Sequence, residues 1–182
     1  MSILVVWSSP NRDGLTAAAK DRLMEGIHLA GGEAVDVCLN GLKLEHCRAC
    51  GDGWGPCRTE GRCVIPDDFA ELYGRLTAAD AIAWVTAVYW HDLTECMKAF
   101  TDRLRRCETK HNHSLSGKKC LLAACAGGTG NGAIQCLDRL ETTLKHMGMA
   151  AVDRLPVIQF NRGYMLSALQ EAGKALAKSV TA

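Results

Sequence analysis

Four cysteines lie within 17 residues of one another in a glycine-rich stretch: Cys47, Cys50, Cys57 and Cys63. Thiolates bind zinc and iron, and closely spaced cysteines in one loop can bring several thiolates to a single metal centre. The spacing Cys-x2-Cys-x6-Cys-x5-Cys leaves three interpretations open: a [4Fe–4S] cluster, a tetrahedral structural zinc, or metal-free cysteines that are free or paired. The stretch is therefore a candidate metal site, and the cysteine spacing alone does not determine which metal it would bind.

The remaining six cysteines are scattered along the chain, and we expect them to pack as small apolar side chains. They are Cys38, Cys96, Cys107, Cys120, Cys125 and Cys136. A secreted, disulfide-stabilised fold is a poor match to this sequence, because a chain of 182 residues can bury an apolar core without disulfide bonds. The first residues also lack the basic and long apolar segments of a secretory signal. We therefore expect a reducing, cytoplasmic setting.

The charge balance argues against several classes of partner. The chain has 21 basic and 20 acidic residues, which gives a net charge of +1 and no electrostatic reason to expect nucleic acid or an anionic membrane. No stretch approaches 18 consecutive apolar residues, so we expect no membrane span. The length predicts a single domain over residues 1–182, with a cysteine-rich loop at 46–66.

Three further segments could contact a ligand, and each follows a stretch that favours a strand. Residues 8–16 combine hydroxyls, an arginine, a glycine and the start of a helix, which suit either a phosphate or an ordinary helix cap. Residues 88–90 place two adjacent aromatic rings against a planar ligand or over the core. Gly127, Gly128 and Gly130 let the backbone approach a ligand closely, or simply make a flexible loop.

The elements that must position these segments alternate along the chain. Apolar periodicity predicts strands at 3–7, 33–39, 80–87, 118–126 and 150–158, and helices at 16–29, 69–76, 94–106, 133–147 and 165–180. This alternation favours an α/β fold whose parallel sheet carries helices on both faces. Ligands bind at the carboxyl ends of such strands, where all three segments would meet. A phosphorylated planar cofactor suits the three together, and flavin mononucleotide (FMN) is the smallest such molecule.

The sequence also resembles a known family, and four groups of residues carry the resemblance. They are Ser8-Ser9-Pro10-Asn11 with Gly14-Leu15-Thr16; Cys47-x2-Cys50 with Cys63-Val64-Ile65-Pro66-Asp67-Asp68; Val88-Tyr89-Trp90 with Met97-Lys98-Ala99-Phe100 and Asp102-Arg103; and Gly127-Gly128-x-Gly130. Over about residues 1–150 they are similar to the flavodoxin-like NADPH-dependent FMN reductases, in the branch that includes the iron–sulfur flavoproteins. The resemblance implies a flavodoxin-like three-layer sandwich with strand order 2-1-3-4-5, bound FMN, and a homodimer or homotetramer with flavin near the subunit interface.

The resemblance implies a role for each loop residue by its position. The FMN phosphate would lie on Ser9, Asn11, Gly14, Leu15 and Thr16, with Arg12 supplying positive charge. The isoalloxazine ring would lie against Val88, Tyr89 and Trp90, with Gly127, Gly128 and Gly130 on its other flank. The chain departs from the family pattern at Ser8, Asn11, Leu15 and Ala87, where Gly, Arg, Asn and Pro are usual.

The cysteine motif departs from the family pattern in one gap. The iron–sulfur flavoproteins that the chain resembles carry Cys-x2-Cys-x2-Cys-x5-Cys or close variants, and the resemblance implies that the four clustered cysteines hold a [4Fe–4S] cluster. Here the first and last gaps agree, but the middle gap is four residues longer, which residues 52–55 account for. Glycines on both sides of Trp54 make this longer loop pliable.

These observations lead to three functional hypotheses. In the first, the chain is an FMN-dependent oxidoreductase that passes electrons from NAD(P)H through flavin to a small-molecule acceptor such as a quinone or a free flavin. No protein residue then acts as catalytic acid or base, because the flavin carries the chemistry. In the second, the chain is an iron–sulfur flavoprotein that carries electrons to or from a ferredoxin-type partner. A colourless binding protein that has lost flavin is a third interpretation.

Two histidine sites and one segment after the last strand are weaker candidates for ligand contact. His91 lies in the aromatic segment and could touch flavin or substrate, or be an ordinary loop histidine. His111 and His113 could form a metal pair, although a solvated loop is the simpler interpretation. Residues 161–164 follow the last strand and could reach a cofactor across a subunit interface, or only turn into the last helix.

Overall fold

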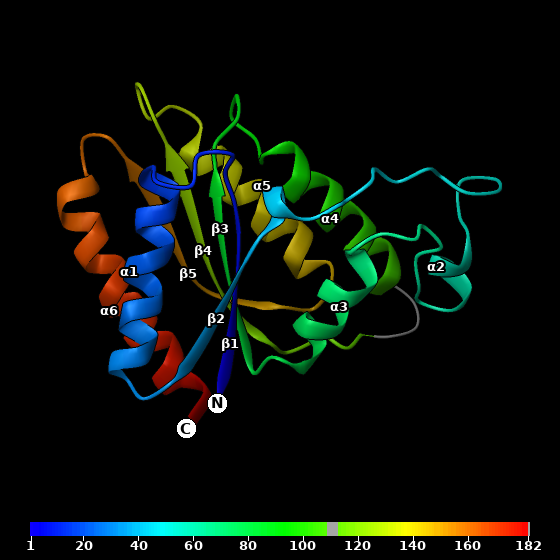
Figure 1. Ribbon diagram of the computed structural model, residues 1–182, viewed down its shortest axis with the longest axis horizontal. Helices are drawn as coiled ribbons and strands as arrows, with labels where there is room; N and C mark the ends of the chain where they lie inside the picture. The colour runs from blue at the N-terminus through cyan, green and yellow to red at the C-terminus, as the bar shows by residue number, and fades with distance from the viewer. Residues whose placement is uncertain (109–112, 182) are drawn as a thin grey trace.

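The computed structural model describes residues 1–108 and 113–181 and contains a five-stranded parallel sheet. The strands are β1 (Ser2–Ser8), β2 (Glu33–Cys38), β3 (Ala81–Ala87), β4 (Lys119–Ala126) and β5 (Ala150–Ile158). Their order across the sheet is β2-β1-β3-β4-β5 (Figure 1). This order is that of the flavodoxin-like doubly wound fold, so the predicted fold class is confirmed.

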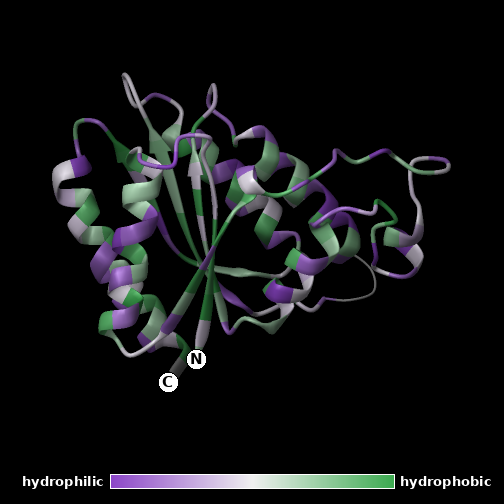
Figure 2. Ribbon diagram, in the orientation of Figure 1, coloured by the Kyte–Doolittle hydropathy of each residue, from purple (hydrophilic) through white to green (hydrophobic). Residues whose placement is uncertain are grey.

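Helices cover both faces of the sheet and complete three layers. On one face lie α1 (Leu15–Leu29) and α6 (Arg162–Thr181); on the other lie α3 (Phe69–Ala78), α4 (Glu95–Cys107) and α5 (Ala133–Lys145), as Figure 1 shows. Apolar residues are concentrated along the central strands, while the helices carry polar residues on their outer sides (Figure 2). A parallel sheet buried on both faces requires this distribution.

The central strands are apolar at successive positions because each face has its own core. In β1, Leu4 and Val6 pack in the core beneath α3, α4 and α5, whereas Ile3 and Val5 pack in the core beneath α1 and α6. All four of these side chains are at most 4% exposed. The edge strand β2 alternates between more and less exposed residues, which explains why its sequence alternates as well.

The α1 and α6 helices pack with their backbones unusually close together, and two glycines make this contact possible. A Cβ added at Gly26 would lie 1.9 Å from the carbonyl oxygen of Gln170, and one added at Gly173 would lie 2.2 Å from that of Leu23. Both distances are too short for any side chain. This contact fixes the position of α1, which begins at the loop predicted to bind phosphate.

Several boundaries differ from the sequence prediction. The last helix begins at Arg162, so residues 161–164 are mostly its first turn; Asn161 stabilises this start by accepting a hydrogen bond from the Ile158 amide at 2.7 Å. Two short helices, η1 (Leu39–Gly41) and α2 (Pro56–Thr59), were not predicted. His111 lies outside the described residues. Within the described ranges, no helix combines the length and apolar character needed to cross a bilayer.

Candidate functional site

The loop between β1 and α1 ends in an open helix terminus. Gly14 is the N-cap of α1 and has extended backbone angles. Within the described part of the chain, no side chain caps this terminus, and no acidic residue lies in its first turn. The first backbone N–H groups of α1 are therefore available to an anion, and the helix dipole favours one there. This geometry fits the phosphate of FMN.

The side chains of this loop divide into an exposed set and a buried set. Asn11 and Arg12 are exposed, and the side-chain oxygen of Asn11 accepts a hydrogen bond from the Asp13 amide at 3.2 Å. Ser9 is buried, and its hydroxyl accepts a hydrogen bond from the Asn11 amide at 3.2 Å, which shapes the turn. Thr16 is also buried, with its hydroxyl hydrogen-bonded to the Cys125 thiol at the end of β4. Burial raises the pKa of that thiol to about 12 although this hydrogen bond opposes the shift, so Cys125 is a structural group.

A buried group of hydroxyls joins the first loop to the second. Ser8 at the end of β1 lies beside Thr86 of β3, with 3.3 Å between their hydroxyl oxygens. Ser8 also shares a short hydrogen bond with the hydroxyl of Thr94. Thr94 in turn caps α4 by accepting from the Met97 amide at 3.4 Å. Ser8, which stands where the family usually has glycine, therefore has two buried threonine partners.

The aromatic segment forms a tight turn that presents Trp90 to solvent. Tyr89 and Asp92 exchange backbone hydrogen bonds of 2.9 and 3.0 Å. The two residues between them have positive φ values, +47° for Trp90 and +67° for His91. Non-glycine residues adopt this conformation only at a cost, and such strain is concentrated at functional sites. The Trp90 side chain is 94% exposed, while His91 is half-buried.

A residue of α5 stabilises this strained turn. The guanidinium of Arg139 donates to the carbonyl oxygen of His91 at 2.7 Å and to the carboxylate of Asp92 at 2.9 Å. Gly132 packs against the same turn, since a Cβ there would lie 2.7 Å from the Cα of His91. Sequence reasoning did not single out Arg139, because its role depends on contacts 47 and 48 residues away in the chain.

The glycine-rich segment after β4 leaves open space at two of its three predicted positions. Nothing lies within 4 Å of a Cβ added at Gly127 or Gly128, so a ligand could approach the backbone there. Gly130 differs, because a Cβ there would lie 2.8 Å from the side chain of Ile158. Glycine at this position therefore lets the loop pack against the end of β5. The loops after β1, β3 and β4 lie together at one edge of the sheet, at the top of Figure 1.

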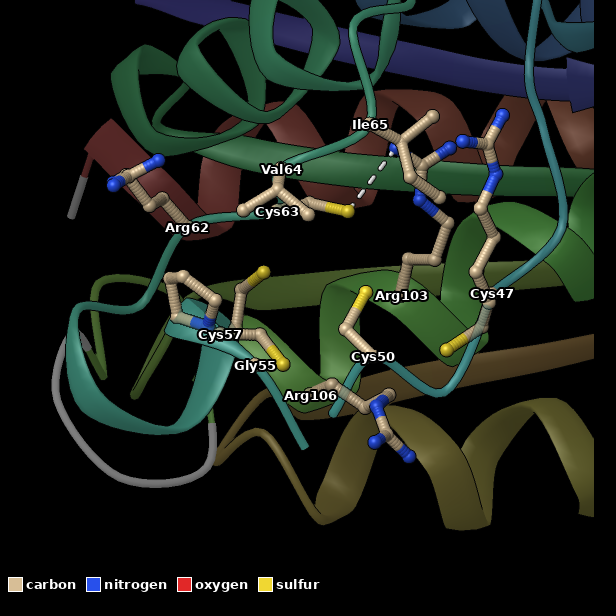
Figure 3. A pocket seen from close by; sticks show the side chains of 13 residues that line it. Cys47, Cys50, Gly55, Cys57, Arg62, Cys63, Val64, Ile65, Arg103 and Arg106 are labelled. Atoms are coloured by element: carbon tan, nitrogen blue, oxygen red, sulfur yellow. Dashed lines mark hydrogen bonds between the residues drawn. The ribbon is translucent and has the colours of Figure 1, made fainter. Parts of the chain in front are cut away.

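The four clustered cysteines line one pocket at a different place in the fold. Cys47, Cys50, Cys57 and Cys63 surround it in Figure 3, and the loop that carries them packs on the outer side of α4. In Figure 1 this loop and α2 extend away from the edge where the three flavin-binding candidates lie. Within the described residues, no three histidine, cysteine, aspartate or glutamate side chains converge closely enough to hold a metal ion. The pocket therefore has suitable donor chemistry without a formed coordination site.

Sequence reasoning did not assign Cys107 or any arginine to this pocket. Cys107, Arg103 and Arg106 all come from the last turns of α4 and line the pocket. Burial, and then the nearby thiols Cys63 and Cys57, raise the pKa of Cys107 to about 12. The helical spacing of 103, 106 and 107 puts them on one face, which is the only sequence signal that could have grouped them.

Arg103 ties the cysteine loop to the core. Its side chain is 1% exposed and donates to the two carboxylate oxygens of Asp67 at 2.6 and 2.8 Å. It also donates to the carbonyl oxygen of Glu45 at 2.9 Å and to Cys63 Sγ at 3.3 Å. Burial alone would raise the pKa of Asp67, but hydrogen bonds from Arg103 and from the amides of Glu45 and Phe69 hold it below its usual range.

All ten cysteines are free thiols, and the scattered ones are mostly buried. Burial raises the pKa of Cys120 and Cys136 to about 12, and that of Cys96 above its usual range. High pKa values keep these thiols protonated and unreactive at neutral pH. They pack as small apolar side chains, in agreement with the sequence analysis.

Comparison with known proteins places the chain in a family. It matches the family model described as NADPH-dependent FMN reductase over residues 1–161. It is 29% identical over 118 residues to an iron–sulfur flavoprotein of Archaeoglobus fulgidus, an alignment that covers 65% of this chain and 51% of that protein, so it spans about half of that relative. It is 29% identical over 155 residues to an iron–sulfur flavoprotein of Methanosarcina thermophila, covering 84% of this chain and 77% of that protein. A solved NAD(P)H:quinone oxidoreductase from Methanothermobacter marburgensis shares the fold, with a TM-score of 0.73 and 19% identity over 97% of this chain and 96% of that one. The chain thus belongs to the NADPH-dependent FMN reductase family, as its loop motifs predicted.

Proposed function

We propose that this protein is an FMN-dependent oxidoreductase that passes electrons from NAD(P)H to a small-molecule acceptor such as a quinone or a free flavin. The observation that carries the proposal is the meeting of three loops at one sheet edge, with the uncapped N-terminus of α1 among them. Family membership supports the same conclusion. Bound FMN would accept electrons from the nicotinamide and deliver them to the acceptor.

The residues of this chain would bind and orient the cofactor. We assign the phosphate to Ser9, Asn11, Arg12, Gly14, Leu15 and Thr16. We assign the isoalloxazine ring to Val88, Tyr89, Trp90, Gly127, Gly128 and Gly130. The exposed positions among them would make direct contacts, while the buried hydroxyls of Ser9 and Thr16 would set the loop's shape. We treat residues 1–182 as one FMN-binding domain.

Anaerobic reduction of the purified, FMN-loaded protein tests this function. NADPH or NADH should bleach the flavin absorbance, and reoxidation by a quinone or by added flavin should identify the acceptor class. Arg12→Gln should weaken FMN binding about tenfold, the scale of one hydrogen bond to a charged group. Arg22→Gln is the matched control, because it removes an exposed arginine on α1 that pairs with Glu25 three residues along the same helix. Failure of the wild-type protein to bind FMN, or of both nucleotides to reduce it, would overturn the proposal.

The cysteine pocket supports a second candidate function, that of an iron–sulfur flavoprotein that exchanges electrons with a ferredoxin-type protein. Its four predicted ligands, Cys47, Cys50, Cys57 and Cys63, line one pocket, and the two relatives described above are named iron–sulfur flavoproteins. Thiolates are the donors that iron–sulfur clusters use. Iron and sulfide analysis of anaerobically purified protein tests for the cluster. Prompt reduction of the flavin by ferredoxin, without reduction of the flavin by NADPH or NADH, would favour this function over the first.

Exposed aromatic side chains at the flavin edge support the expected homodimer or homotetramer. Trp90 after β3 is 94% exposed and Phe160 after β5 is 89% exposed. Large apolar side chains that protrude at one edge are typical of surfaces that bind a partner. Light scattering on the FMN-loaded protein measures the mass directly. A monomer at micromolar concentration would contradict this part of the proposal.

A further inference from the structure

The side chain of Arg106 attaches the four residues that lengthen the cysteine motif to helix α4. The guanidinium of Arg106 donates a hydrogen bond to the carbonyl oxygen of Gly53. It also lies over the indole ring of Trp54, 4.0 Å from the ring centroid. Arg58 approaches the same ring at 5.7 Å. The insertion therefore makes specific contacts with the fold instead of extending into solvent.

These contacts let the longer loop return to the pocket. Gly53 has a φ of +106°, a conformation that favours glycine and turns the chain immediately before Trp54. Gly55 passes close to Cys50, since a Cβ at position 55 would lie 3.0 Å from the Cβ of that cysteine. The chain then begins α2, which places Cys57 on the wall of the same pocket (Figure 3). The insertion thus brings Cys50 and Cys57 to one cavity despite the longer gap.

Arg106 differs from the other arginines of the pocket in its charge environment. Arg48, Arg62 and Arg103 pair with Glu45, Glu60 and Asp67, respectively. In the portion of the chain that the structure describes, Arg106 has no carboxylate partner, and its buried Nε has no hydrogen-bond partner. A partly buried cation beside a group of thiols, without a counter-ion, is unfavourable unless an anion completes the site.

We propose that Arg106 is a positioning residue for an iron–sulfur centre held by the four cysteines. It fastens the lengthened loop through Gly53 and Trp54, and it supplies the positive charge that balances the net negative charge of a thiolate-bound cluster. This inference rests on the second candidate function above. Hydrogen bonds and charges around a cluster set its reduction potential, so Arg106 acts on both the retention of iron and the potential.

Four variants of the full-length protein, purified anaerobically, separate these two effects. Arg106→Gln should release iron to a chelator roughly tenfold faster than wild type. It should also shift the cluster's potential to a more negative value, because a cation stabilises the more negatively charged reduced state. Arg106→Lys should restore the potential while releasing iron faster than wild type, since lysine keeps the charge but not the planar stacking. Trp54→Ala should release iron faster with the potential unchanged, and Arg22→Gln should match wild type.

The FMN content of each variant serves as the folding control, because the flavin-binding loops lie away from this pocket. Wild-type protein that contains zinc or no metal in place of iron and sulfide would overturn the inference. So would an Arg106→Gln protein whose iron release and potential equal those of Arg22→Gln. Iron-loaded protein that fails to bind FMN would overturn the oxidoreductase proposal and leave this inference standing.

Discussion

Replacing Asp67 with asparagine should strongly destabilise the protein, because it leaves the guanidinium of Arg103 buried without its counter-ion. The two side chains are 0% and 1% exposed and share hydrogen bonds of 2.6 and 2.8 Å. Asparagine keeps the shape of the aspartate but not its charge. Removing one partner of a buried ion pair costs about 3–5 kcal/mol. Glu60→Gln breaks an exposed ion pair in the same loop and should cost at most about 0.5 kcal/mol.

Urea denaturation of the FMN-saturated proteins at neutral pH measures the loss of unfolding free energy in Asp67→Asn and in Glu60→Gln. The pKa of Asp67 is lowered in the folded protein, so its contribution is complete above its usual value of 3.8 and is lost as the pH falls through the lowered pKa. The difference in unfolding free energy between wild type and Asp67→Asn should therefore shrink only in strong acid. An Asp67→Asn cost no larger than that of Glu60→Gln would refute the argument that this pair anchors the cysteine loop.

Three other predictions follow from individual contacts. Gly26→Ala should lower the free energy of unfolding by about 3 kcal/mol in a thermal or urea experiment, because its Cβ would lie 1.9 Å from a carbonyl oxygen. Gly74→Ala is the control: nothing lies within 4 Å of its Cβ, so it should stabilise the protein by about 0.5–1 kcal/mol. Equal effects of the two substitutions would contradict the close packing at Gly26. Gly132→Ala should displace the strained aromatic turn and weaken FMN binding in a fluorescence titration, and unchanged affinity would argue that the turn does not contact the flavin. Hydrogen bonds from Arg154 hold the pKa of Glu141 at about 2, below its usual 4.5, so its contribution to stability is full above pH 4.5 and lost as the pH falls towards 2. Arg154→Gln should remove about 1 kcal/mol or less of this acid-sensitive stability, because that arginine is 41% exposed. An unaltered pH profile of unfolding would exclude a stabilising pair between Arg154 and Glu141.

The fold was predictable because its central strands are apolar at nearly every position. Residues 3–7 are apolar and residues 80–87 are mostly apolar, as is typical of strands buried on both faces of a parallel sheet, and they correspond to β1 and β3. The start of the last helix was misplaced by three residues because Asn161 stabilises it through contacts with the end of β5. The short helix α2 was missed because four residues are too few for any periodicity.

Those parts of the candidate site were predictable whose residue types and spacing lie within a single loop. The glycines after β4 and the cysteine spacing can be read locally, and the structure places each set in one loop or pocket. Arg106 and Arg139 could not be predicted, because each acts on a loop at least 47 residues distant in the chain. The close packing at Gly130 could not be predicted either, because it depends on Ile158 at the end of β5, whose side chain would lie 2.8 Å from a Cβ at position 130. Such roles depend on how distant segments meet, which a single sequence does not encode locally.

The glycine contact between α1 and α6 has a consequence for how the protein is synthesised. Helix α1 leaves the ribosome early, but the surface around Gly26 is covered only when α6, the last helix, has emerged. Until then α1 lacks its helical partner on that face, and the loop at its start lacks the support of this contact. We therefore expect FMN binding to follow the emergence of α6, so nascent chains stalled before residue 162 should not bind FMN.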